Sequence, residues 1–175
     1  MISKTLDWIE KMVRVYKVAP GLVLDVGSRE NTASKGTSTS PRRLFPGSTY
    51  IGIDRTPGLN VDRIMSAYDL SRNFEGGMFD AVLCLHVLEH LVNPWVAVEQ
   101  INWVLRKGGL FFCAMPEFGY PLHEGRRGGD AQDYWRASED AVREFIFGDY
   151  DILELEHAKS PFGKHPFIHC LGVRK

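Results

Sequence analysis

Runs of apolar residues alternate with amphipathic stretches along the whole chain. The apolar runs that predict strands cover residues 22–27, 49–54, 61–65, 79–86, 110–115, 150–155 and 167–173. The stretches that predict helices cover residues 1–19, 40–45, 93–107 and 138–147. Runs that are apolar throughout suit parallel strands covered on both faces, and the last two predict a closing antiparallel hairpin. We therefore expect an α/β fold of three layers, with a mostly parallel seven-stranded sheet between helices.

The order of these elements predicts one domain over residues 1–175, because no repeat or low-complexity linker interrupts it. Only residues 117–137 form a long stretch without helix or strand signals. Irregular segments of this length in compact domains are commonly functional. This one follows the fifth predicted strand, so we expect it to lie over the edge of the sheet where a substrate binds.

Composition narrows the class of protein. Hydrophobic residues make up 44% of the chain, charged residues 25%, and the net charge is −1. This near-neutrality predicts no long-range attraction to nucleic acid or to a membrane surface, and no apolar run approaches the about 20 residues of a membrane span. We expect a small-molecule substrate and a cytoplasmic protein whose three cysteines, Cys84, Cys113 and Cys170, are reduced.

Polar residues close the first two predicted strands. Asp25 lies at the end of the first strand and Asp54 at the end of the second, and Gly27 follows the first. In parallel α/β sheets the ligand sits beyond the carboxyl ends of the strands, and an acid after the second strand suits ribose hydroxyls. The alternative interpretation is that each acid only caps a neighbouring helix or turn.

Five motifs follow one another in the order typical of a known family. They are Leu24-Asp25-Val26-Gly27-Ser28, Gly52-Ile53-Asp54, Phe79-Asp80-Ala81-Val82, Val87-Leu88-Glu89-His90-Leu91 and Val104-Leu105-Arg106-Lys107-Gly108-Gly109. Over roughly residues 20–155 the chain resembles the class I S-adenosylmethionine-dependent methyltransferases, in particular the type 11 methyltransferase domain. The resemblance implies a Rossmann-like fold, S-adenosylmethionine as cofactor and methyltransferase activity.

The resemblance also implies a set of cofactor contacts. They are Asp25, Gly27, Ser28 and Arg29 at the methionine part, Asp54 and the adjacent Arg55 at the ribose, Ser66 and Ala67 at the adenine, and Leu85 and His86 on the sulfonium side. At Ser66 the family often has an acid. The glycine-rich loop also departs from the family, because Arg29 and Asn31 replace two glycines. Arg29 either pairs with the cofactor carboxylate or partly fills the pocket, which keeps a non-catalytic binding module open as an alternative.

The chemistry requires few fixed residues, because the cofactor itself carries an activated methyl group. A base is needed only for a protonated acceptor such as a hydroxyl. The segment 117–137 contains His123 ahead of Asp133-Tyr134-Trp135-Arg136, which resembles one branch of the family. We assign His123 as catalytic base or substrate contact, and Asp133, Trp135 and Arg136 to the substrate pocket. The alternative is that Trp135 anchors the segment while Arg136 binds backbone carbonyls.

Two other reaction classes are weighed against methyl transfer. His86-Val87-Leu88-Glu89-His90 fits the H-x-x-E-H pattern of zinc peptidases, but the residues before His86 predict a strand rather than the helix this pattern needs. No metal site is therefore expected. A dinucleotide-binding oxidoreductase would show G-x-G-x-x-G after the first strand, where this chain keeps only Gly27. The preferred prediction is methyl transfer to a small-molecule or sugar-like acceptor, with a hydroxyl as the accepting group.

Overall fold

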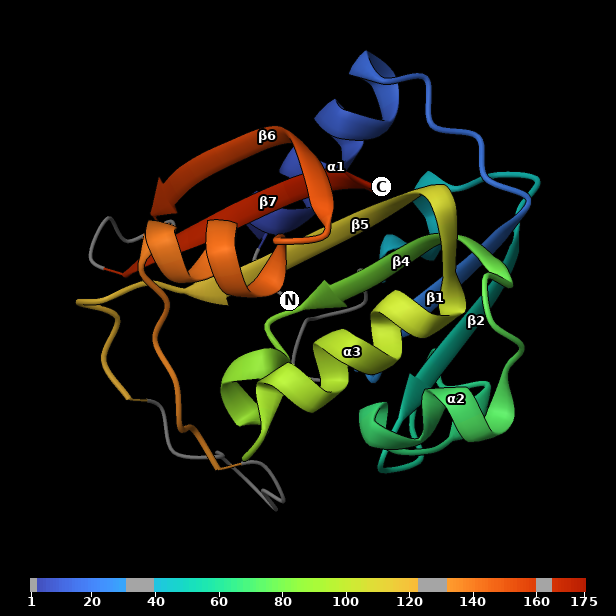
Figure 1. Cartoon of the computed structure of the whole chain (residues 1–175), viewed down its shortest axis with the longest axis horizontal. Helices are drawn as coiled ribbons and strands as arrows, with labels where there is room; N and C mark the ends of the chain where they lie inside the picture. The colour runs from blue at the N-terminus through green and yellow to red at the C-terminus, as the bar shows by residue number, and fades with distance from the viewer. Residues whose placement is uncertain (1–2, 31–39, 123–131, 160–164) are drawn as a thin grey trace.

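The computed structural model describes residues 3–30, 40–122, 132–159 and 165–175 (Figure 1). One seven-stranded sheet runs through them, in the order β3-β2-β1-β4-β5-β7-β6. Its strands are β1 (Leu22–Val26), β2 (Thr49–Asp54), β3 (Arg63–Ile64), β4 (Phe79–Leu85), β5 (Leu105–Pro116), β6 (Tyr150–Lys159) and β7 (Pro166–Arg174). The first five pair in parallel, whereas β7 is antiparallel to both of its neighbours. The predicted α/β sheet with a closing hairpin is confirmed.

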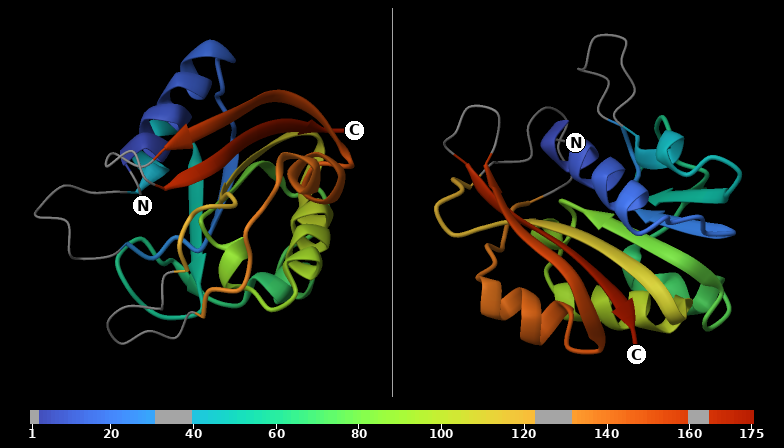
Figure 2. Two further views of the ribbon diagram at one scale, coloured as in Figure 1. Left: turned by 90° about the vertical axis from the view of Figure 1, so that its left-hand side faces the viewer. Right: turned by 90° about the horizontal axis from the view of Figure 1, so that it is seen from above.

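The helical segments lie on both faces of the sheet, as the right-hand view of Figure 2 shows. They are α1 (Ser3–Val15), α2 (Leu70–Asn73), α3 (Pro94–Val104), the 3-10 turns η1 (Pro41–Leu44), η2 (Ala67–Asp69) and η3 (Leu88–His90), and the π-helical segment η4 (Ala141–Ile146). None of the helices in these described ranges has the length and apolar character needed to cross a membrane.

One face of the sheet is covered by α1. Trp8, Ile9 and Met12 recur at helical spacing on α1, and all three are buried against the sheet together with Phe45. Helix α1 therefore forms because its apolar stripe is removed from water against the strands. This packing brings the first turn of α1 close to the carboxyl ends of the central strands, where its Thr5 is fully buried.

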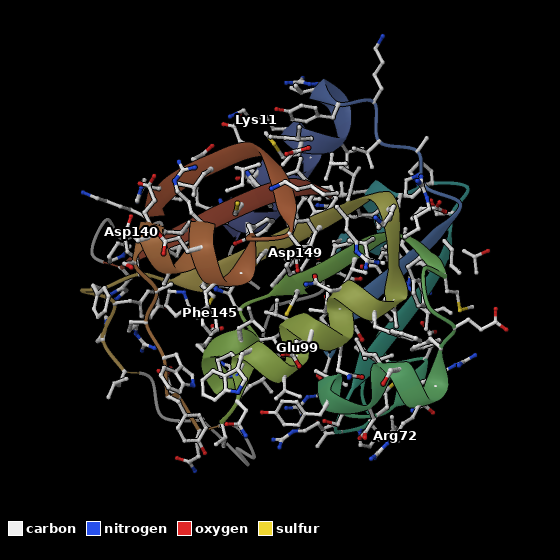
Figure 3. All side chains as sticks on the ribbon, in the orientation of Figure 1. Lys11, Arg72, Glu99, Asp140, Phe145 and Asp149 are labelled. Carbon is white, nitrogen blue, oxygen red and sulfur yellow. The ribbon has the colours of Figure 1, made fainter. Side chains whose placement is uncertain are left out.

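The other face is covered by α2, α3 and η4. Ala97, Ile101 and Val104 of α3 are fully buried in this layer. Glu99, labelled in Figure 3, lies on the exposed side of the same helix. Helix α3 begins at Pro94, as the sequence predicts, because proline suits the first turn of a helix.

Several elements differ from the prediction in their bounds or type; α1, for example, ends at Val15 rather than at residue 19. Helix α3 ends at Val104 rather than continuing to residue 107, because Leu105 pairs with Phe79 and is buried as part of β5. The third strand is limited to Arg63–Ile64, both exposed at the edge of the sheet. The helix predicted over 138–147 is a π-helical segment, although the hydroxyl of Ser138 does accept a capping bond from the amide of Ala141.

The strand order reverses between β1 and β4, which places the candidate site. The chain moves outward from β1 through β2 to β3 and then returns to the other side of β1. Connections that leave in opposite directions open a crevice at the carboxyl ends of these two strands. The residues that follow β1 and β4 therefore meet at one edge of the sheet.

Candidate active site

A cleft of about 140 Å³ lies at this reversal of strand order. Its lining comes from the turn after β1, from the start of η1 and from the end of β4. The lining residues are Gly27, Ser28, Arg29, Glu30, Ser40, Pro41, Leu85 and His86. Of the ten residues expected at the cofactor, Gly27, Ser28, Arg29, Leu85 and His86 thus meet in one cleft.

The turn after β1 depends on a glycine at position 27. Gly27 has a φ of +77°, and a Cβ atom there would lie 2.3 Å from Cγ2 of Val87. The amides of Gly27 and Ser28 both donate to the carbonyl of Ile53, at 2.8 and 2.9 Å. This turn therefore holds the ends of β1, β2 and the segment after β4 together, and no side chain fits at its apex.

The rest of the first loop is tied to the loop after β2 by side chains. Ser28 Oγ donates to the carbonyl of Asn60 at 2.9 Å, and Asn60 Nδ2 donates to Glu30 Oε2 at 2.7 Å. Asn60 has a positive φ of 67°. Arg29 packs closely over Gly58, where a Cβ atom would lie 2.7 Å from Arg29 Cγ. Asn31, the other departure from the family pattern, lies outside the described residues.

Asp25 is buried beneath this edge rather than lining the cleft. Its carboxyl group is 1% exposed and accepts a hydrogen bond of 2.9 Å from the hydroxyl of Tyr50. Burial raises the pKa of Asp25 to about 7, against the lowering effect of the Tyr50 bond. Near neutral pH the side chain is therefore an equilibrium of acid and carboxylate, held within the sheet.

Asp54 and Ser66 stand at the carboxyl ends of β2 and β3. Asp54 is half-buried, and its Oδ1 accepts bonds of 3.0 Å from both the amide and the hydroxyl of Thr56. Ser66 Oγ accepts a bond of 3.2 Å from the amide of Tyr68 and caps η2, whose Ala67 is buried. Both side chains thus organise the turns that follow their strands.

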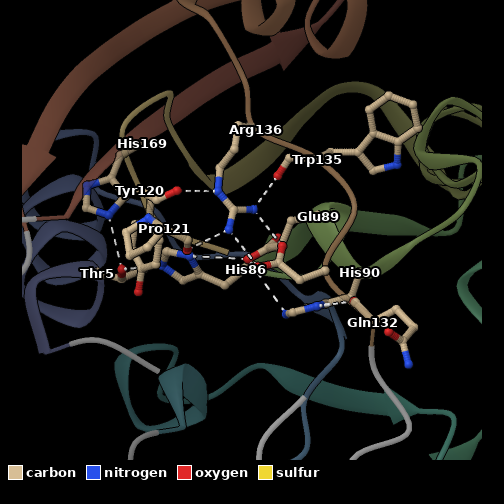
Figure 4. A network of polar contacts seen from close by, with 11 residues as sticks. Thr5, His86, Glu89, His90, Tyr120, Pro121, Gln132, Trp135, Arg136 and His169 are labelled. Atoms are coloured by element: carbon tan, nitrogen blue, oxygen red, sulfur yellow. Dashed lines mark hydrogen bonds and ion pairs between the residues drawn. The ribbon is translucent and has the colours of Figure 1, made fainter. Parts of the chain in front are cut away.

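The end of β4 carries a network of polar side chains (Figure 4). His86 has a positive φ of 56°, and its Nε2 lies 3.0 Å from Oγ1 of Thr5. Its Nδ1 lies 3.7 Å from Oε1 of Glu89, whose side chain is 1% exposed. Burial raises the pKa of Glu89 to about 8, so this carboxyl group is mostly protonated at pH 7. His90 Nε2 lies 3.9 Å from the same oxygen, and His90 Nδ1 is 2.7 Å from the carbonyl of Gln132.

The two described ends of segment 117–137 are joined by Arg136. Its guanidinium donates to both carboxylate oxygens of Asp133. It also donates to the carbonyls of Tyr120 and Pro121 (Figure 4). Trp135 Nε1 donates to the carbonyl of Leu91 at 2.8 Å. These contacts hold both ends of the segment against η3. His123 lies outside the described residues.

The H-x-x-E-H pattern does not form a helical metal site. His86 precedes η3 in a bend with a positive φ, and η3 itself is a single 3-10 turn over Leu88–His90. Zinc sites of this pattern need both histidines on one face of an α-helix. Within the part of the chain that the structure describes, no three histidine, cysteine, aspartate or glutamate side chains are grouped to hold a metal ion.

Comparison with known families agrees with this fold. The profile of the methyltransferase domain matches residues 24–113, which is more than half of the 175-residue chain. The chain belongs to this methyltransferase family. The matched range runs from β1 into β5 and so includes the Gly27 turn and the end of β4, which confirms the family resemblance noted from the five motifs.

This methyltransferase domain is similar to curated relatives over part of their length. A ubiquinone biosynthesis O-methyltransferase of Dechloromonas aromatica is 29% identical over 123 residues, which cover 62% of this chain and 49% of the relative. The enzyme of the same name from Xanthomonas oryzae pv. oryzae is 32% identical over 107 residues, covering 55% and 44%. The match therefore spans about half or less of these relatives.

Solved structures share the fold of this methyltransferase domain. The 1,6-didemethyltoxoflavin-N1-methyltransferase of Burkholderia thailandensis, with bound S-adenosylhomocysteine, aligns with a TM-score of 0.73 at 14% identity, covering 98% of this chain and 78% of that one. The magnesium protoporphyrin IX methyltransferase of Synechocystis PCC 6803, with bound S-adenosylmethionine, aligns at 0.66 and 18% identity, covering 98% and 79%. At these identities the likeness establishes the Rossmann-like architecture.

Proposed function

We propose that this protein transfers the methyl group of S-adenosylmethionine to a hydroxyl of a small molecule, with sugar-like acceptors included. The observation that carries the proposal is the cleft at the reversal of strand order, where Gly27 and His86 meet. Membership of the methyltransferase family and similarity to two enzymes named O-methyltransferases support it. Three buried free cysteines fit a cytoplasmic location.

The side chains around the cleft fit the chemistry of this cofactor. Arg29 lines the cleft with a cation suited to the amino acid carboxylate. The bonds that Asp54 accepts from described residues both use Oδ1, so we assign Oδ2 to a ribose hydroxyl, with Arg55 next in sequence. Leu85 adds an apolar wall. We assign Ser66 and Ala67 to the adenine end of the cofactor. Because the hydroxyl of Ser66 caps η2, we assign recognition of the base to backbone groups there. When bound, the cofactor supplies a methyl group already activated by its sulfonium.

The acceptor is proposed to bind between the end of β4 and segment 117–137. Trp135 is 38% exposed beside the exposed ring of Trp95, so it provides apolar area for an acceptor. Asp133 and Arg136 are proposed to shape this pocket. Their ion pair and the bonds from Arg136 to the carbonyls of Tyr120 and Pro121 form a clamp between the two described ends of segment 117–137. His123 is proposed to contact the acceptor.

A non-catalytic binding module is the second candidate. Arg29 and Glu30 project side chains into the lining of the cleft, and bonds through Asn60 hold this loop to the next one. Such a loop favours the second candidate if it keeps the cofactor out. Titration with the cofactor distinguishes the two functions, because only the methyltransferase is expected to bind it.

Calorimetric titration of the purified, metal-free protein tests the proposal. S-adenosylmethionine and S-adenosylhomocysteine are titrated in parallel with NAD and zinc as controls. We expect micromolar binding of the first two only, followed by S-adenosylhomocysteine formation with a panel of catechols and monosaccharides. Absence of binding to either compound would overturn the proposed function in favour of the binding module.

A further inference from the structure

A chain of three side chains links the cleft to the protein interior. Oγ1 of Thr5 lies 3.0 Å from Nε2 of His86 and 3.1 Å from Nε2 of His169 (Figure 4). These residues come from α1, the end of β4 and β7, and they are separated by 81 and 164 positions in the sequence. Thr5 and His169 are fully buried, whereas His86 lines the cleft. The fold therefore connects His86 at the cleft, through Thr5, to His169 in the interior.

The hydroxyl between the two rings imposes an order on their protons. A threonine hydroxyl has one proton, so it donates to one imidazole and accepts from the other. Burial lowers the pKa of His169 to about 4, so this ring is neutral at pH 7. Nδ1 of His169 is buried without a hydrogen-bond partner among the described residues, and the ring stacks on Trp8. His169 is thus a fixed, uncharged partner for Thr5.

His86 has a backbone conformation that is unfavourable for a residue with a side chain. A φ of +56° is uncommon for a residue with a Cβ, because the Cβ crowds the following carbonyl oxygen. Its amide donates to the carbonyl of Ala114 at 2.9 Å, and its ring meets the edge of Phe167. Conformations of this kind persist where the surroundings over-determine them, and they cluster at active sites.

We propose that His86 is the base that accepts the acceptor's proton at Nδ1, and that Thr5 is the positioning residue that holds its ring. This inference rests on the proposed function. As the bond between the acceptor oxygen and the methyl carbon forms and the bond from that carbon to sulfur breaks, the hydroxyl proton passes to Nδ1. Nε2–H of the resulting imidazolium donates to Thr5, whose hydroxyl donates to His169. Under this assignment the proton goes to His86 rather than to His123.

The charged and titratable groups around His86 suit this task. Oε1 of Glu89 lies 3.7 Å from Nδ1, close enough for its charge to act on a newly formed imidazolium. Oε2 of Glu89 is buried without a hydrogen-bond partner in the described ranges. Arg29 and Glu30 line the same cleft and carry opposite charges. His90 lies on the far side of Glu89 and contacts Gln132. Ionised Glu89 stabilises the imidazolium, so we expect turnover to rise with pH as Glu89 loses its proton.

The experiment compares four variants of the full chain with wild type. His86→Gln removes the base, Thr5→Val removes the hydroxyl at nearly constant volume, and Thr5→Ser keeps the hydroxyl. Thr49→Val, at the exposed start of β2, is the matched control. Three quantities are measured: the affinity for S-adenosylhomocysteine, turnover against pH with an acceptor found in the hydroxyl panel, and the imidazole titration of His86 by NMR in the S-adenosylhomocysteine complex.

We expect His86→Gln to lower kcat by at least about 100-fold, the lower limit for loss of a general base, and to lower kcat by a larger factor than it weakens S-adenosylhomocysteine binding. Thr5→Val should displace both the pH profile and the NMR titration of His86, and Thr5→Ser should restore both. Thr49→Val should match wild type. A purely structural Thr5 would lower thermal stability without moving either titration.

The outcomes separate this inference from the proposed function. Turnover by His86→Gln close to that of wild type, with a large loss in His123→Ala, would overturn the assignment of the base while leaving methyl transfer intact. An NMR titration of His86 that is identical in wild type and Thr5→Val would overturn the role of Thr5. A wild-type protein that binds the cofactor but methylates no acceptor would overturn the proposed function, and the base with it. If Thr5→Val does not fold, the comparison of His86→Gln and Thr5→Ser with wild type decides.

Discussion

The hydroxyl of Tyr50 donates a 2.9 Å hydrogen bond to Oδ2 of Asp25, and both residues are buried on the adjacent strands β1 and β2. Burial nevertheless raises the pKa of Asp25 to about 7 from an ordinary value of 3.8. The acid of the first strand is therefore a group within the protein that exchanges a proton near neutral pH. The raised pKa of Asp25 therefore affects how the free energy of unfolding depends on pH.

Stability should fall as pH rises from about 4 to about 7, because the folded protein keeps the proton of Asp25 that the unfolded chain has lost. The slope from one such proton is at most about 1.4 kcal/mol per pH unit. Asp25→Asn should remove this contribution, and Tyr50→Phe should extend it to higher pH because it deletes a bond that lowers the pKa. Chemical denaturation across this range measures both. Glu89 contributes a slope of the same sign, so an unchanged slope in Asp25→Asn would assign the whole effect to Glu89.

Gly27 and Gly47 form a matched pair for testing the turn after β1. Both have a positive φ, of 77° and 82°, but a Cβ at Gly27 meets Val87 at 2.3 Å whereas nothing lies within 4 Å at Gly47. Gly47→Ala should therefore cost only about 1 kcal/mol for the backbone, and Gly27→Ala about 1–3 kcal/mol more for the clash. Denaturation midpoints give the difference. Equal costs would mean that the turn relaxes easily away from Val87.

The strands were predictable wherever burial on both faces left a continuous apolar run. The run 79–86 matches β4 to within one residue, and the run 110–115 lies inside β5. The two-residue strand β3 has no such pattern, because Arg63 and Ile64 are both exposed at the sheet edge. The boundary at Leu105 was missed for another reason: residues 105–107 suit a helix locally, and the pairing of Leu105 with Phe79 starts the strand there.

The cleft residues were predictable because strand ends in such a sheet converge. Gly27 and His86 follow adjacent strands, and their meeting requires only the order of the elements. Thr5 and His169 were not found, because Thr5 contacts His86 from 81 positions away, His169 contacts Thr5 from 164 positions away, and neither forms a motif with His86. Tertiary packing of α1 and β7 brings them together, and a single sequence carries no signal of that packing.

Asp54 should contribute directly to cofactor affinity. If Oδ2 accepts from the ribose, Asp54→Ala should weaken binding of S-adenosylhomocysteine by about 1.5–3 kcal/mol, the range for lost bonds to a charged group. Asp151→Asn serves as the control, because its side chain is 75% exposed and its Lys175 partner lies 3.9 Å away. Calorimetry on folded variants makes the comparison. An affinity of Asp54→Ala equal to that of the control would leave Asp54 with only its bonds to Thr56.

The Asp133–Arg136 pair should be worth far more to stability than a surface pair. The two side chains are 3% and 9% exposed, so Arg136→Met leaves a buried carboxylate without its cation and frees the carbonyls of Tyr120 and Pro121. The expected loss is about 3–5 kcal/mol, whereas Arg143→Met, which breaks an exposed pair with Glu139, should cost under about 1 kcal/mol.

Adding Asp133→Asn to Arg136→Met should restore part of that loss, because the neutral amide no longer needs the guanidinium. The sum of the single losses should therefore exceed the loss in the double variant, as measured by chemical denaturation at pH 7. This sign follows from a carboxylate that is costly to bury alone. If Arg136→Met instead cost no more than Arg143→Met, the clamp would not hold the two ends of segment 117–137 together. The acceptor pocket would then need another support.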